Sequence, residues 1–209
     1  MYQEESIRQF TDELASSASM PGGGTAAASG GAMGAALLSM VCNLTIGKEK
    51  FRDVEAALKE VLAETEQLRL ELLGMMDEDA DSFNRIIAAY RLPKNTPEET
   101  DARAKAIQQA IIGATEVPLK MVEKCARVVE LSMPVAEKGN VGAVSDAGVG
   151  ALLAEAALLS AAFNIKINLR SIKDAAFAEK ARSRMETLVA SASETCAKAV
   201  KVVDERLGA

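Results

Sequence analysis

Two carboxylates in this sequence stand where acid–base chemistry could use them. Asp79 belongs to the acidic run DEDAD at 77–81 and precedes Phe83 by four residues, a spacing that puts both on one helix face. We therefore expect Asp79 to turn inward, where burial raises a carboxyl pKa toward neutrality, while the rest of the run is solvated. Asp146 follows Ser145 at an expected helix start, where a plain capping role is equally favoured by the helix dipole.

Several other kinds of catalytic site are excluded by composition. The 209 residues include no histidine, so His-based triads and His-ligated metals are absent. The three cysteines, Cys42, Cys125 and Cys196, are odd in number and far apart without a CxxC pair. This pattern favours buried free thiols in a reducing cytoplasm over disulfides or zinc ligation. We expect no metal site and no prosthetic group.

Charge and aromatic content argue against two classes of partner. The net charge is −6, tryptophan is absent and aromatic residues make up 3%, which disfavours a nucleic-acid partner. The stretch 15–47 carries no charge, but Pro21 and a triple glycine interrupt it. It is therefore expected to form a buried helix and not a membrane span. The first ten residues do not resemble a signal peptide, so the protein is expected in the cytoplasm.

Glycine is concentrated in two windows. Seven of the 14 glycines lie in 22–47 and four in 139–150, which indicates close helix packing or close approach of backbone to a ligand. Gly22–Gly24 opening a helix could also hold an anion, although the Walker signature is missing. The segments 35–46 and 156–167 match at seven of twelve positions. This similarity is due either to chance or to pseudo-symmetry, and pseudo-symmetry would bring Asn43 and Asn164 to one cleft. Alternatively, each Asn side chain could form a hydrogen bond to a neighbouring helix.

The remaining pattern is helical and predicts an all-α fold. We expect a single domain over 1–209, built as a bundle of long antiparallel helices, and we expect the protein to be a homodimer. Thr96, Pro97 and Glu99 form a capping-box signature, and Pro134 is expected to kink its helix. The expected helices span 3–17, 25–46, 50–90, 98–115, 116–138, 145–164 and 174–206.

Three segments then resemble the cyclodeaminase/cyclohydrolase family of tetrahydrofolate enzymes, in the family's order. They are PGGGTAAASGGAMGAALLSMVCNLTIGKEKF (21–51), DADSFNRIIAAYRLPKNT (79–96) and GNVGAVSDAGVGALLAEAALLSAAFNIKINL (139–169). The resemblance implies an all-helical homodimer that binds a tetrahydrofolate substrate in a cleft lined by these motifs. SMVCNLTIGK and YRLPKNT look closer to the stand-alone methenyltetrahydrofolate cyclohydrolases, which make 10-formyltetrahydrofolate.

Two alternatives remain open at this point. One is formimidoyltetrahydrofolate cyclodeaminase, the other activity of the family, which releases ammonia and forms 5,10-methenyltetrahydrofolate. The other is a non-catalytic helical binding protein whose glycines serve packing alone. A shared fold permits any of these functions.

The resemblance and the chemistry of methenyl hydrolysis together suggest roles for particular residues. A carboxylate, Asp79 or Asp146, would activate water, and Lys48 would donate a hydrogen bond to the reacting atoms. The anionic tail of the substrate needs basic residues at the entrance of the cleft. The candidates are Lys48, Lys50 and Arg52, or alternatively Arg91 and Lys94. The residues expected to bind substrate are Pro21, Gly22, Gly23, Gly24, Thr25, Ser39, Asn43, Phe83, Asn140, Ser145, Asn164 and Asn168.

Overall fold

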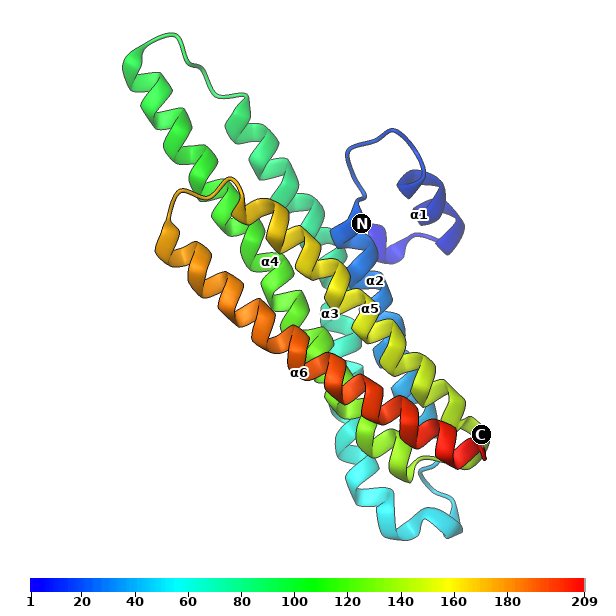
Figure 1. Ribbon diagram of the computed structural model, residues 1–209. Coiled ribbons are helices and arrows are strands. Elements are labelled where there is room, and N and C mark those ends of the chain that lie inside the picture. Colours follow the sequence, from blue (N-terminus) through cyan, green and yellow to red (C-terminus); the bar gives the residue numbers. More distant parts are fainter. Residues whose placement is uncertain (209) are drawn as a thin grey trace.

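The computed structural model describes residues 1–208, which form helices and no strands (Figure 1). The all-α prediction is therefore confirmed. In residues 1–208, three 3₁₀ helices and one short α-helix precede or separate the long helices. The full order is η1 (Tyr2–Glu4), α1 (Ile7–Leu14), α2 (Gly23–Asn43), η2 (Glu49–Val54), α3 (Glu55–Tyr90), α4 (Pro97–Lys138), η3 (Val141–Ala143), α5 (Val144–Leu169) and α6 (Ala175–Leu207).

Helices α2 to α6 form one bundle, and the hairpin of α3 and α4 extends beyond it at one end (Figure 1). The uncharged helix α2 packs against α3, α4 and α5. Leu38, Leu72, Met121 and Leu158 from these four helices are fully buried in the core. Burying each such side chain contributes about 1.5–3 kcal/mol, which explains why helix α2 has so few polar positions.

Helices α2 and α5 touch backbone to backbone, which accounts for glycines in both windows. A Cβ atom built on Gly34 would lie 2.8 Å from the Gly150 carbonyl oxygen, and one on Gly150 would lie 3.0 Å from the Gly34 oxygen. One turn away, a Cβ on Gly30 would meet the Ala157 methyl at 3.7 Å. These contacts run in opposite sequence directions, so the two helices are antiparallel.

Several predicted boundaries are wrong. The N-terminal helix covers only Ile7–Leu14, and Ile7 is 72% exposed, because this short segment packs at the edge of the bundle. The two helices expected at 98–115 and 116–138 are the single helix α4, which continues through Pro118 and Pro134 because its buried face is held by the neighbouring helices.

The predicted capping box of α4 is present, and the predicted start of α5 is wrong. The Thr96 hydroxyl accepts from the Glu99 amide at 3.2 Å, which confirms the capping box of α4. Helix α5 instead begins one residue early, with Ala143 at its N-cap, so Ser145 lies inside the first turn.

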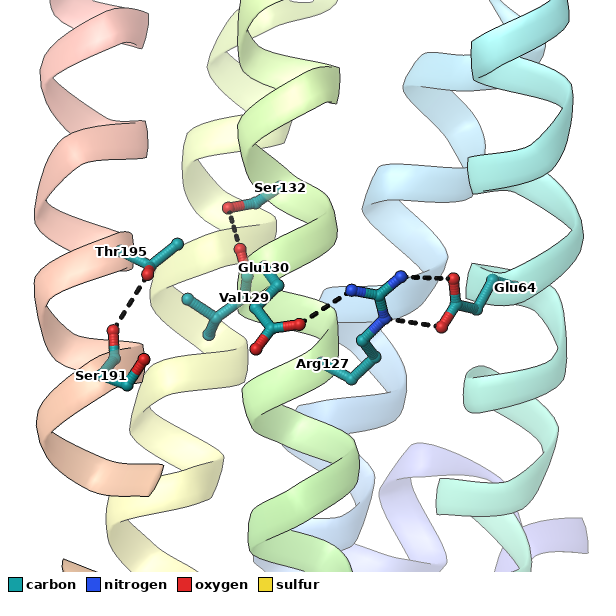
Figure 2. A network of polar contacts seen from close by, with 7 residues as sticks. All are labelled: Glu64, Arg127, Val129, Glu130, Ser132, Ser191 and Thr195. Atoms are coloured by element: carbon teal, nitrogen blue, oxygen red, sulfur yellow. Dashed lines mark hydrogen bonds and ion pairs between the residues drawn. The ribbon is translucent and has the colours of Figure 1, made fainter. Parts of the chain in front are cut away.

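An ion pair fastens α3 to α4 far from the glycine-rich end of α2 (Figure 2). The Arg127 guanidinium donates to Glu64 through Nε at 2.6 Å and Nη2 at 2.8 Å, and to Glu130 at 2.8 Å. These hydrogen bonds raise the pKa of the arginine. The pair is partly exposed, so it contributes about 0.2–1 kcal/mol and sets helix alignment more than stability.

All three cysteines are buried and free, as predicted. Helix α2 and the segment 141–169 are long and apolar enough to pass a length-and-composition test for membrane spans, yet more than half of α2's apolar window is buried inside the bundle.

Candidate active site at the glycine-rich start of α2

A cavity of about 190 Å³ opens where the start of α2 meets α3, α4 and α5. It combines residues as far apart in the chain as Ser19 and Asn168, so only the tertiary fold creates it. It is lined by Ser19, Met20, Gly22, Gly23, Gly24, Asp79, Ser82, Phe83, Ile86, Ala114, Pro118, Asn164 and Asn168. Seven of these thirteen were predicted from sequence as site residues: the three glycines, Asp79, Phe83, Asn164 and Asn168.

Asp79 faces the first turn of α2. Its Oδ2 accepts a hydrogen bond from the Thr25 hydroxyl at 2.9 Å. A Cβ atom on Gly24 would lie 2.6 Å from the Asp79 Cγ, so only glycine lets the carboxylate come this close. The start of a helix offers free N–H groups and a partial positive charge to an anion. The first turn of α2, which has no side-chain cap, is therefore capped by a carboxylate from α3.

Burial raises the pKa of Asp79, and the hydrogen bonds from the Thr25 hydroxyl and amide partly oppose that rise. Asp79 is also the one titratable side chain among the described residues that line the cavity. A carboxyl group with a raised pKa in a semi-enclosed cavity can take and return protons nearer neutral pH than a solvated one.

Asn168 is positioned by a proline in the facing helix. Pro118 has no N–H, so the carbonyl of Ala114, four residues earlier in α4, lacks its helical donor. The Asn168 side-chain amide fills that vacancy, donating to the Ala114 oxygen at 3.1 Å. This bond fixes the α5 side chain at the cavity wall.

Asn164 and Phe83 complete the wall. The Asn164 amide nitrogen donates to the Ser160 carbonyl at 3.0 Å, one turn back in α5. Within residues 1–208, the side-chain oxygens of Asn164 and Asn168 accept no hydrogen bond, so both can accept from a ligand. Phe83 presents an aromatic ring, a surface suited to a flat heterocycle.

Three other predicted residues lie behind or away from the cavity. Pro21 and Thr25 are buried beside it, and Thr25 acts through Asp79. Ser39 is in the core instead, where its hydroxyl lies 2.8 Å from that of Thr65. The expectation that Ser39 contacts substrate is corrected, because its side chain is 3% exposed and already paired.

The remaining predicted residues gather at the opposite end of α2. Twenty positions separate Gly23 from Asn43, about 30 Å along a helix. There the Asn140 side chain donates to the Leu44 carbonyl at 3.1 Å, and its backbone amide donates to Thr45. Because α2 and α5 are antiparallel, a single chain does not bring Asn43 and Asn164 to one cleft. The residues at this far end are Asn43, Lys48, Asn140, Ser145 and Asp146, together with Lys50 and Arg52.

Sequence reasoning missed six of the lining residues: Ser19, Met20, Ser82, Ile86, Ala114 and Pro118. Pro118 did leave a signal, since a proline inside an otherwise uninterrupted helical pattern frees a carbonyl that must find another donor. The others are small or apolar residues whose type does not mark them out.

Comparison with known proteins assigns the family. The family described as formiminotransferase-cyclodeaminase matches residues 6–187. The chain is 54% identical over 188 residues to a methenyltetrahydrofolate cyclohydrolase of Methylorubrum extorquens, covering 90% of each chain. It is 35% identical over 194 residues to a formimidoyltransferase-cyclodeaminase of Rattus norvegicus, covering 93% of this chain and 36% of that protein.

The fold agrees with these sequence relationships. A crystal structure of formiminotetrahydrofolate cyclodeaminase from Thermotoga maritima superposes with a TM-score of 0.81 at 26% identity, covering 100% of this chain and 98% of that one. Match length, identity and fold all point the same way, and this chain belongs to the formiminotransferase-cyclodeaminase family.

Proposed function

We propose that this protein is a methenyltetrahydrofolate cyclohydrolase, which hydrolyses 5,10-methenyltetrahydrofolate to 10-formyltetrahydrofolate. The observation that carries the proposal is the 54% identity to the Methylorubrum extorquens cyclohydrolase over 90% of both chains. The cavity at the start of α2 supports it, because it offers one partly buried carboxylate to a substrate whose reacting carbon is cationic.

Asp79 has two roles in this reaction: it stabilises the positive charge of the substrate, and it accepts and returns a proton. The bridge carbon of the substrate is part of an amidinium cation, which a nearby carboxylate attracts. Water loses one proton to Asp79 as its oxygen bonds to that carbon, giving a tetrahedral carbinolamine. The bond from this carbon to N5 then breaks with its electron pair on N5, which takes the proton back from Asp79. The carbinolamine hydroxyl becomes the formyl oxygen, and its proton leaves to solvent.

The other cavity residues orient the folate. The amide oxygens of Asn164 and Asn168 accept from pterin N–H groups, and Phe83 packs on a ring face. Free N–H groups in the first turn of α2, at Gly23 and Gly24, donate to polar atoms of the ligand. The protein is proposed to act in the cytoplasm, as a homodimer and without a prosthetic group.

The test is a spectroscopic assay with two substrates. Methenyltetrahydrofolate has a near-UV absorbance band that is lost on hydrolysis. Purified protein should remove this band well above the uncatalysed rate, and no acceleration would overturn the proposal.

The competing activity is cyclodeaminase, which is the activity named for the structurally similar Thermotoga maritima enzyme. In a separate cuvette with formimidoyltetrahydrofolate, that activity would make the methenyl band appear together with ammonia. Appearance in this cuvette, without loss in the first, assigns the alternative.

A further inference from the structure

We propose that the N-terminal arm, residues 1–14, closes a second ligand site against α2 and α3, and that this site takes a small apolar molecule carrying a primary ammonium group. The inference goes beyond the proposed function and does not depend on it, because it concerns a cavity separate from the one that holds Asp79. Its test is a binding measurement that needs no turnover.

The arm consists of η1 and α1 and lies beside the start of α2, outside the bundle of long helices (Figure 1). A cavity of about 250 Å³ separates it from α2 and α3. Among residues 1–208, this cavity shares no lining residue with the candidate active site. Sites for drug-sized ligands typically measure about 300–1,000 Å³, so the occupant here is smaller than that class.

The walls of this second cavity are mainly apolar. Phe10 of the arm faces Ala32 of α2 and Leu73 and Met76 of α3 across it. Side chains of this kind exclude water and favour an apolar group in its place. The body of the ligand is therefore a hydrocarbon group of about the size of one benzene ring.

Glu5 places an acceptor without a donor in these apolar surroundings. Its side chain lines the cavity, and its Oε2 is buried with no hydrogen-bond partner within the described part of the chain. A buried acceptor that lacks a donor is unfavourable, and a charged one is more so. A ligand ammonium group would supply both the donor and the counter-charge that this oxygen lacks.

The surroundings of Glu5 carry further negative charge. Burial, and then the charges of Glu13, Glu5 and Asp77, raise the pKa of the Tyr2 phenol. Asp77 accepts from the Tyr2 backbone amide at 2.7 Å, while its second oxygen is also buried and unpartnered. Within residues 1–208, none of these three carboxylates forms an ion pair. The electrostatic potential at the arm therefore favours a cation.

Arg69 does not cancel this preference, although it lines the same cavity. Its guanidinium is already held by Glu66, with Nη2 at 2.7 Å from one carboxylate oxygen and Nε at 3.2 Å from each. The Arg69–Glu66 pair is neutral in sum, so the charge of Glu5 stays uncompensated. An anionic ligand would find no free cation among the described lining residues.

Two aromatic rings add to the preference for an organic cation. Tyr2 and Phe10 both line the cavity, and their rings meet edge to face with centroids 6.3 Å apart. Aromatic faces attract ammonium groups. In the described chain, no three acidic, histidine or cysteine side chains lie close enough together to hold a metal ion. Because Glu5 Oε2 lacks a hydrogen-bond donor, the ammonium must carry N–H groups and is not quaternary.

Calorimetric titration of the full chain with 2-phenylethylammonium tests the site. Two comparison ligands are trimethyl(2-phenylethyl)ammonium, which has the charge but no N–H, and 3-phenylpropionate, which has the opposite charge. The primary ammonium should bind saturably, and the quaternary one about ten-fold or more weaker, because it makes no charge-assisted hydrogen bond. Absence of saturable binding with a dissociation constant below about 1 mM overturns the proposal. Equally tight binding of either comparison ligand also overturns it.

Variants identify which carboxylate holds the ligand. Glu5→Gln should weaken binding of 2-phenylethylammonium about ten-fold or more. Glu4→Gln is the matched control and should bind normally, because Glu4 is exposed and does not line the cavity. The rival location is the active-site cavity, where Asp79 lies near the ring of Phe83. Asp79→Asn should therefore leave ammonium binding unchanged, and loss of binding there with full binding in Glu5→Gln overturns the proposal.

A crystal soaked with 2-(4-bromophenyl)ethylammonium gives the location directly. The anomalous signal of bromine should lie between Phe10 and Leu73, with the ammonium nitrogen within hydrogen-bond distance of Glu5 Oε2. A bromine signal found only elsewhere overturns the proposal. A protein that binds the ammonium as expected but turns over neither folate overturns the proposed function alone.

Discussion

The carboxylate of Asp79 occupies the space that a side chain at position 24 would need. A Cβ built on Gly24 lies 2.6 Å from Asp79 Cγ and 2.7 Å from Oδ2. Glycine at position 24 is therefore required for the Asp79 carboxylate to lie here. The Thr25 hydroxyl, 2.9 Å from Oδ2, fixes the orientation of that carboxylate. This contact joins the first family motif of the sequence, at 21–51, to the second, at 79–96.

Replacing Asp79 with Asn should remove catalysis while keeping the fold. Loss of the general base typically costs about 10²–10⁴-fold in rate, measured as the decay of the methenyl band under saturating substrate. Asp81→Asn, two residues away and exposed, is the matched control and should turn over normally. A full rate for Asp79→Asn would eliminate the proposed mechanism.

Gly24→Ala should lower both activity and stability, because the new methyl group displaces the Asp79 carboxylate or the start of α2. Overpacking of this kind costs about 1–3 kcal/mol, seen as a lower midpoint in urea. Gly74→Ala is the matched control, since a Cβ there meets nothing within 4 Å on helix α3. It should raise stability by up to about 1 kcal/mol through helix propensity. Equal effects of the two substitutions would contradict the close packing at position 24.

Asp79 should also give the protein a distinctive pH dependence. Burial raises its pKa above the ordinary value of 3.8, so the folded state binds its proton more tightly than the unfolded chain. The free energy of unfolding contributed by this group therefore falls as pH rises from about 3.8 through the raised pKa. Asp79→Asn lacks this loss and should melt higher than wild type at pH 7, with the difference vanishing below pH 3.8. The acid limb of kcat/KM should follow the same raised pKa, and a limb at 3.8 or lower would argue against Asp79 as base.

Pro118 and Asn168 should be energetically coupled. Asn168→Ala removes the donor to the Ala114 carbonyl, and leaving a buried acceptor unpaired costs about 1–3 kcal/mol. In a Pro118→Ala background, residue 118 regains an N–H that can serve the same carbonyl. The cost of Asn168→Ala should therefore shrink there, as a double-mutant cycle of urea midpoints will measure. Additive costs would mean that the two residues act independently.

Local patterns were sufficient wherever one helix decides the outcome. The helical class, the Thr96 capping box and the buried thiols followed from residue types and short spacings. Asp79 was separated from its acidic neighbours because its distance to Phe83 already places it on the inward face. Boundaries were less predictable: α4 runs through Pro118 and Pro134, because contacts along its buried face outweigh the local disruption that a proline causes.

The sequence alone determined the family motifs, the helices and the inward-facing carboxylate, because each depends on residue type and on periodicity within a single element. Only the tertiary structure decided how these parts meet. The antiparallel course of α2 and α5 puts Gly23 beside Asn164 and carries Asn43 to the far end, a result that depends on packing between helices more than 100 residues apart. The contacts of Gly24 with Asp79 and of Pro118 with Asn168 have the same origin. A contact between two helices depends on how the helices are placed relative to each other, so no residue spacing in the sequence predicts it.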